Sequence, residues 1–123
     1  MTQEDKELLL KDLCARLPYK VIVQSTFYCC DGTIWKHENE TLTPNLLNYP
    51  IHRYKPYLFP LSSMTEEQKE EYCQLQQKII YNSKGVVSKD ITEYINWCYK
   101  NHLDINDLIP QGLAIDATGL NIY

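Results

Sequence analysis

The sequence lacks any long apolar run. In its 123 residues, no stretch approaches the roughly 20 apolar residues that a membrane-spanning helix needs. A secretory signal is also missing, because Met1 to Glu7 are polar and acidic where a basic start and an apolar stretch are required. We therefore expect a cytoplasmic protein without membrane association. The odd count of five cysteines agrees with a compartment that keeps thiols reduced.

Positive charge is also scarce. The formal net charge is −4 and the acidic residues are spread along the chain, so the basic stripe that binds a phosphate backbone is missing. The sequence also lacks a glycine-rich phosphate loop, a serine elbow and a zinc-protease helix motif. No motif assigns an activity, and we expect no cofactor. A small enzyme without a recognisable motif is an alternative.

The residues that are present indicate one α+β domain over residues 1–123. The hydrophobic fraction of 44% and the charged fraction of 23% are ordinary for a globular domain of this length. The patterns predict, in order, a helix at about 3–16, strands at 20–29 and 33–38, a Pro/Tyr-rich irregular segment at 39–63, and helices at about 65–82 and 88–102. Val86 and Val87 form a possible short strand between these helices. Without regular strand–helix alternation, this order predicts two later helices packed on a small antiparallel sheet.

The two predicted strands form a hairpin with an Asp-Gly turn. Asp31 and Gly32 suit a two-residue type I′ turn, because both central residues of that turn need positive φ. Such a turn would place Tyr28 opposite Trp35, and side-chain alternation would put both on the outer face. The expected core face carries Val21, Val23, Phe27, Cys29 and Ile34.

The segment from 39 to 63 contains four of the six prolines. Proline lacks the N–H donor that a central strand needs, so any strand here should be short or lie at an edge. The segment is also rich in leucine and tyrosine, so we expect it to pack onto the domain. Long loops of this kind often carry function.

Three groups of residues suggest chemistry, and each has a plainer interpretation. Cys29, Cys30 and His37 offer metal ligands, but adjacent strand residues point to opposite faces, so we expect no metal site. Cys98 and His102 are four residues apart on one helical face and could touch. A buried cysteine beside a partly buried histidine is the favoured interpretation. Asp104 and Asp107 are typical of local caps.

Ten tyrosines are an unusual number for this length. Tyrosine combines a large contact area with a polar tip, which suits interfaces and small cores alike. The hypothetical binding surface is aromatic and consists of Tyr28, Trp35, Tyr54 and Tyr57. The stretch from His52 to Tyr57 also mixes cations with aromatic rings, so Arg53 and Lys55 carry an alternative, single-stranded nucleic-acid binding.

Three stretches together resemble a known group of proteins. They are Lys6–Tyr19; Lys55–Leu58 followed by Pro60–Thr65; and Trp97 and His102 leading to Leu108–Pro110 and Gly112–Ile115. This pattern is similar to small uncharacterised proteins encoded by phages, prophages and mobile elements of Bacteroides-type gut bacteria. The resemblance implies a bacterial intracellular setting and carries over no catalytic residue or cofactor. The resulting hypothesis is a non-catalytic accessory protein that binds a host factor or a copy of itself.

Overall fold

The computed structural model describes residues 1–81 and 88–123, and these residues form an α+β fold, which confirms the predicted fold class. The described helices are α1 (Gln3–Arg16), α2 (Glu66–Tyr81) and α3 (Ser88–Lys100). The described strands are β1 (Ile22–Tyr28), β2 (Ile34–Thr41), β3 (Tyr54–Leu58) and β4 (Ile115–Asp116). Among the described helices, none has the length and apolar character needed to span a membrane. The predicted strand at Val86 and Val87 lies outside the described residues.

Reciprocal capping at Thr2 and Thr65 begins the first two helices, next to the predicted helix starts. At α1, the Asp5 backbone N–H donates to the Thr2 hydroxyl and the Thr2 N–H donates to the Asp5 carboxylate. At α2, Thr65 and Gln68 exchange the same two bonds, at 3.0 and 3.2 Å. These bonds satisfy N–H groups that have no partner inside the helix.

The four strands form one mixed sheet in the order β2-β1-β3-β4. β1 pairs antiparallel with β2 and β3, whereas β4 pairs parallel with β3. The expectation of a purely antiparallel sheet is therefore wrong at β4. We call the face that carries Val23, Ser25 and Tyr54 the inner face, and the opposite face, with Gln24 and Lys55, the outer face.

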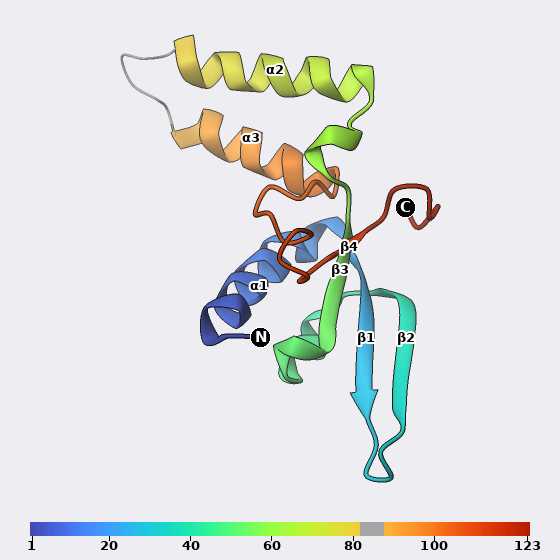
Figure 1. Cartoon of the computed structure of the whole chain (residues 1–123). Helices are drawn as coiled ribbons and strands as arrows, with labels where there is room; N and C mark the ends of the chain where they lie inside the picture. Colours follow the sequence, from blue (N-terminus) through green and yellow to red (C-terminus); the bar gives the residue numbers. More distant parts are fainter. Residues whose placement is uncertain (82–87) are drawn as a thin grey trace.

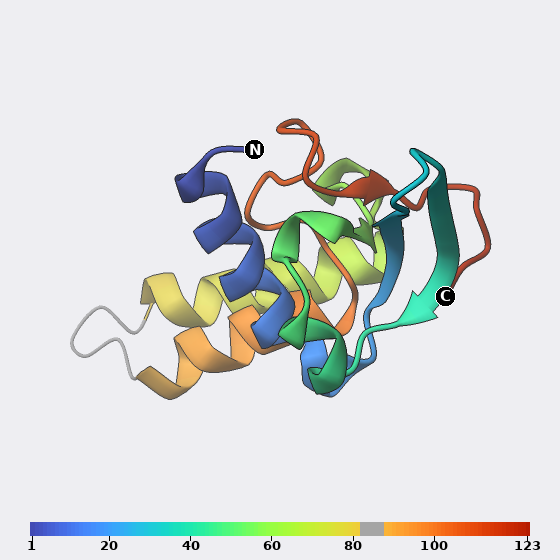
Figure 2. The same ribbon diagram turned by 90° about the horizontal axis from the view of Figure 1, so that it is seen from below.

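α1 and the C-terminal tail, residues 117–123 after β4, lie on opposite sides of this sheet (Figure 2). Leu9 and Leu13 of α1 join the buried core with Val23 and Tyr54 of the inner face. α2 and α3 pair with each other at one end of the molecule, and the β1–β2 hairpin projects from the other end (Figure 1). The sheet is thus covered by α1, where the sequence analysis expected the two later helices.

β3 occupies an interior position although it contains Pro56. The prediction of a short strand is confirmed by its five residues, but it is not an edge strand. Pro56 lies opposite Val23. The backbone N–H and C=O groups of the next pair, Gln24 and Lys55, point at each other across β1 and β3, so those of Pro56 and Val23 point away from each other. The missing N–H therefore points toward β4, and β4 begins to pair only at Tyr57.

The hairpin turn has three residues, not the two that the sequence predicts. Cys29 and Thr33 close the turn, with the Cys29 N–H donating to the Thr33 carbonyl at 2.8 Å. Gly32 alone adopts positive φ, at 86°, and the Asp31 carboxylate accepts the Thr33 N–H. This arrangement matches the three-residue hairpin with a left-handed third residue. Strand pairing consequently shifts by one residue, so that Phe27 faces Trp35 and Tyr28 faces Ile34.

A buried ion pair joins α1 to the segment after α3. Arg16 donates to both carboxylate oxygens of Asp12, at 2.6 and 3.1 Å, and to the Leu103 carbonyl at 2.7 Å. Asn106 adds a bond to Asp12, and the Arg16 guanidinium lies 4.7 Å from the centre of the Tyr99 ring. Because both charged side chains are fully buried, this network stabilises the fold only with all its partners in place.

Candidate functional site

The far end of the β1–β2 hairpin exposes three large hydrophobic side chains. The exposed fractions are 60% for Tyr28, 56% for Ile34 and 58% for Trp35. Tyr28 and Ile34 are cross-strand partners on the outer face, and Trp35 lies on the inner face opposite Phe27. The predicted Tyr28/Trp35 pair on one face is therefore wrong, because the one-residue register shift moves Trp35 to the other face and brings Ile34 beside Tyr28.

The inner face of the hairpin end carries a cluster of rings around one arginine. The guanidinium of Arg53 lies 5.6 Å from the centre of the Phe27 ring and 5.9 Å from that of Tyr49. His37 meets Phe27 edge-to-face, with ring centres 5.4 Å apart. Together with Trp35, these residues bring a cation and several aromatic surfaces onto one side of the hairpin.

Tyr54 and Tyr57 do not belong to this surface, because their exposed fractions are 0% and 4%. Tyr54 is part of the core under α1, where burial raises the pKa of its phenol. Tyr57 lies on the outer face, and the C-terminal Tyr123 hydroxyl donates to its carbonyl oxygen at 2.8 Å. Their prediction as surface residues is wrong, because β3 is an interior strand covered on both sides.

Arg53 and Lys55, the residues of the nucleic-acid alternative, lie on opposite faces of the sheet. Arg53 packs over the Phe27 ring on the inner face, whereas Lys55 pairs with Gln24 and points to the outer face. A single phosphate backbone follows one surface. This separation weighs against the two cations acting together on one strand.

Cys98, His102 and Asp104, which the sequence suggests as chemical groups, each have a structural explanation. Burial raises the pKa of the Cys98 thiol to about 11, so it is not a thiolate at neutral pH. His102 follows α3 with a φ of 57°, and its ring stacks on Tyr123 at 3.7 Å between centres. Asp104 is confirmed as a cap, accepting the N–H groups of Leu108 and Ile109 at 2.8 and 2.9 Å.

Cys29 and Cys30 sit at the exposed hairpin turn as free thiols. Within residues 1–81 and 88–123, no cluster of three or more histidine, cysteine or acidic side chains is suited to hold a metal ion. Cys29, Cys30 and His37 therefore form no such cluster among the described residues.

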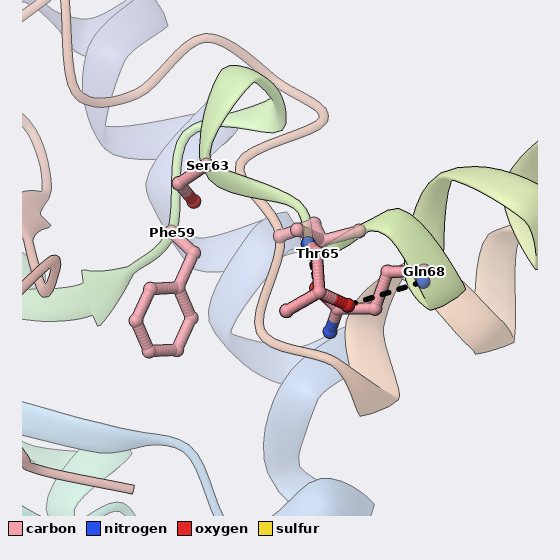
Figure 3. A pocket seen from close by; sticks show the side chains of 5 residues that line it. Phe59, Ser63, Thr65 and Gln68 are labelled. Atoms are coloured by element: carbon pink, nitrogen blue, oxygen red, sulfur yellow. Dashed lines mark hydrogen bonds between the residues drawn. The ribbon is translucent and has the colours of Figure 1, made fainter.

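A cavity of about 210 Å³ lies where β3 leads toward α2 (Figure 3). Phe59, Ser63, Thr65, Gln68 and Leu103 line it. The polar groups of Thr65 and Gln68 are engaged in the helix cap, and Ser63 donates to the Pro60 carbonyl. None of the lining side chains is an acid, a base or a thiol. The cavity is also smaller than the roughly 300–1,000 Å³ typical of small-molecule sites.

Phe27, Tyr49 and Ile34 belong to the hairpin surface, although they are not among the residues that the sequence predicts for it. Ile34 and Phe27 are expected in the core, and Tyr49 is expected only as the first residue of an aromatic loop that runs to Phe59. If the turn is given three residues in place of two, the sequence predicts the observed strand pairs, Phe27 with Trp35 and Tyr28 with Ile34. No local signal predicts that Arg53 packs over Phe27, because the two residues lie more than twenty positions apart in the sequence.

Comparison with protein-family models, curated proteins and solved structures found no match. The resemblance to small phage and mobile-element proteins therefore stays an expectation, and the site rests on its own geometry.

Proposed function

We propose that this chain is a non-catalytic accessory protein that binds another protein through the end of its β1–β2 hairpin. The observation that carries the proposal is the exposure of Tyr28, Ile34 and Trp35, each more than half exposed, on a hairpin that projects from the body (Figure 1). Tryptophan and tyrosine are the residues that most often dominate binding energy at protein interfaces. Their exposure in the free chain is costly unless a partner covers them.

The edge strand β2 favours recognition by side chains over the addition of a strand. Lys36 lies on this edge, and a bulge around Glu38 and Asn39 interrupts its pairing with β1. Asn39 takes a φ of 59° there. Lysines and bulges are features by which proteins protect sheet edges from pairing with other strands. Aromatic anchors on the two hairpin faces are the better-supported means of contact.

The experiment compares partners captured by the tagged protein and by two variants. The bait is incubated with lysate from a Bacteroides-type bacterium, the setting that the resemblance implies, with and without nuclease. We expect a protein to be retained stoichiometrically in both conditions and lost with Trp35→Ala. Truncation of an anchoring tryptophan costs about 2 kcal/mol or more at an interface, a loss of at least about 30-fold in affinity.

Leu10→Ala is the matched control, because Leu10 is 43% exposed on α1, away from the hairpin. It should retain the partner. Equal retention by Trp35→Ala and the control would contradict the proposal. Loss of all bound protein on nuclease treatment would point instead to nucleic acid. Tyr57 is unsuitable as a test position, because it is buried and its truncation would disturb the sheet.

A further inference from the structure

Arg53 packs against two aromatic rings, and its side chain makes no polar contact with the part of the chain that the structure describes. Its guanidinium lies 5.6 Å from the centre of the Phe27 ring and 5.9 Å from the centre of the Tyr49 ring. Its Nε atom is buried without a hydrogen-bond partner. No acceptor or carboxylate among residues 1–81 and 88–123 pairs with the side chain, although Arg53 is half-buried.

This state leaves a strong donor group unused. A guanidinium presents five N–H groups in a fixed planar fork that matches a carboxylate. The Nε atom is buried, whereas the two Nη groups are not among the buried atoms, so an incoming carboxylate would meet the Nη groups. The two flanking rings already restrict the side chain, so less conformational entropy is lost when an acceptor binds.

The surroundings of Arg53 add an apolar anchor. Trp35 lies opposite Phe27 on the same face and is 58% exposed. His37 contacts the Phe27 ring from the same strand as Trp35. The nearest acidic side chain on this face in the paired strands is Glu40, and it already accepts the Ser25 hydroxyl at 2.7 Å. On this face the Arg53 cation, which has no polar partner among the described residues, and the exposed indole of Trp35 both adjoin Phe27.

We propose that the inner face of the hairpin end binds an acidic peptide segment of a partner protein. An aspartate or glutamate of the segment accepts two hydrogen bonds from Arg53, and a neighbouring large apolar side chain packs on Trp35. The inference rests on the proposed function, since it names the chemistry of the partner at the same hairpin. A carboxylate is favoured over a phosphate backbone because Lys55, the next cation along the chain, points to the opposite face.

The test uses a displayed library of random linear peptides selected on the purified full chain. Selected peptides are synthesised with a fluorescent label and titrated by anisotropy. We expect them to share an Asp or Glu beside a large apolar residue. Arg53→Met should weaken their binding about 10- to 100-fold, as expected for hydrogen bonds to a charged group. Replacing the peptide acid by its amide should weaken binding similarly, and the two changes together should be less than additive.

Lys55→Met is the matched control, because it removes the same charge from the opposite face, and it should leave the affinity within about twofold. Arg53→Lys keeps the charge and loses the fork, so it should bind more weakly than the wild type. Circular dichroism of each variant verifies the fold. Selected peptides without a shared acid, or equal weakening by Arg53→Met and Lys55→Met, would overturn the inference.

The inference and the proposed function fail in different ways. Peptide binding that is lost with Trp35→Ala but unchanged by Arg53→Met keeps the hairpin as the binding surface and overturns the acidic partner. Peptide binding that neither change affects, or selection that enriches nothing, overturns the acidic peptide, and capture by the Trp35→Ala variant then decides separately whether the hairpin binds a partner. A labelled single-stranded oligonucleotide of thymidines is titrated in parallel. Arg53-dependent binding of this probe, without peptide binding, would assign the face to nucleic acid instead.

Discussion

At the scale of single residues, His102 connects several parts of the fold. It takes a φ of 57° directly after α3, where its N–H donates to the Tyr99 carbonyl and the next N–H, of Leu103, donates to the Cys98 carbonyl. This left-handed termination of a helix is usually made by glycine and sometimes by asparagine. The ring of His102 stacks on Tyr123, and its carbonyl accepts the Phe59 N–H at 2.8 Å. The residue therefore holds the end of α3 against β3 and the C-terminal tail.

The protonation of His102 should make the stability of the protein depend on pH. Burial, helped by the nearby positive charge of Arg16, lowers the pKa of His102 from 6.5 to about 4. Between these values the unfolded chain binds a proton that the folded chain does not bind. The contribution of neutral His102 to the free energy of unfolding is thus fully present above about pH 6.5 and is lost as the pH falls toward 4. His102→Asn, which tolerates the left-handed backbone, should remove this component.

The measurement is the free energy of unfolding in urea at a series of pH values from 7 to 4. We expect the wild type to lose about 1–3 kcal/mol more than His102→Asn across this interval. The exposed His52 supplies the control variant, His52→Asn, whose curve should run parallel to the wild type. Parallel curves for wild type and His102→Asn would contradict the prediction.

At the scale of elements, the pairing of β1 with β3 is completed by a side chain from the C-terminus. The Ile22 N–H donates to the Tyr123 hydroxyl at 2.9 Å, and that hydroxyl donates to the Tyr57 carbonyl at 2.8 Å. Ile22 and Tyr57 would be the next pair after Val23 and Pro56. The hydroxyl therefore occupies the place of a backbone hydrogen bond and ties the tail to two strands.

Removing this hydroxyl should loosen the sheet locally. Tyr123→Phe keeps the ring that stacks on His102 but leaves the Tyr57 carbonyl without its partner. We expect a loss of about 0.5–1.5 kcal/mol in the free energy of unfolding, together with faster hydrogen exchange of the Ile22 amide. Tyr28→Phe removes a hydroxyl from a side chain that is 60% exposed and should change neither quantity. Unchanged exchange at Ile22 in Tyr123→Phe would show that the bridge does not hold β1.

The same elements explain how much of the fold could be predicted. The helix beginnings at Thr2 and Thr65 and the Asp31-Gly32 turn depend on residues within a few positions of each other, and each was located correctly. The register of the hairpin was not, because Asp31-Gly32 fits both the predicted two-residue turn and the three-residue turn that Cys29 and Thr33 close. β3 was missed as an interior strand, because Pro56 is tolerated only through the late start of β4.

The candidate site was predicted to a smaller extent, and for the same reason. Tyr28 and Trp35 were named from the hairpin pattern, and both are exposed. Tyr54 and Tyr57 were named with them, although α1 and the distant C-terminal tail cover β3. The unpaired state of Arg53 depends on which acidic groups come near it in space. Spacing along the chain contains no information of that kind.

At the scale of the whole molecule, the hairpin end and the α2–α3 pair lie at opposite ends of the α1-covered sheet (Figure 1). The core between them contains α1, whose buried residues are Leu9, Asp12, Leu13 and Arg16. In contrast, Leu75 is the only buried residue in the part of α2 whose side chains are described. Several side-chain contacts of α2 go to α3, including Tyr72 with Tyr94 and Glu71 with Trp97, both at 2.9 Å.

This distribution predicts that the local opening of α2 costs less free energy than the unfolding of the core. Regions with few buried apolar contacts open locally, and native-state hydrogen exchange measures the free energy of each opening. We expect the amides of α2 to exchange through an opening at least about 1 kcal/mol less costly than that of β1 and α1. Trp97→Phe, which removes the bond to Glu71, should lower the cost further in α2 and leave β1 unchanged. If α2 and β1 exchange with one shared free energy, and Trp97→Phe lowers both equally, the molecule unfolds as a single cooperative unit. In that case a partner bound at the hairpin would stabilise α2 as strongly as it stabilises the sheet. If α2 opens separately, the stabilisation by the partner would be confined to the sheet and α1.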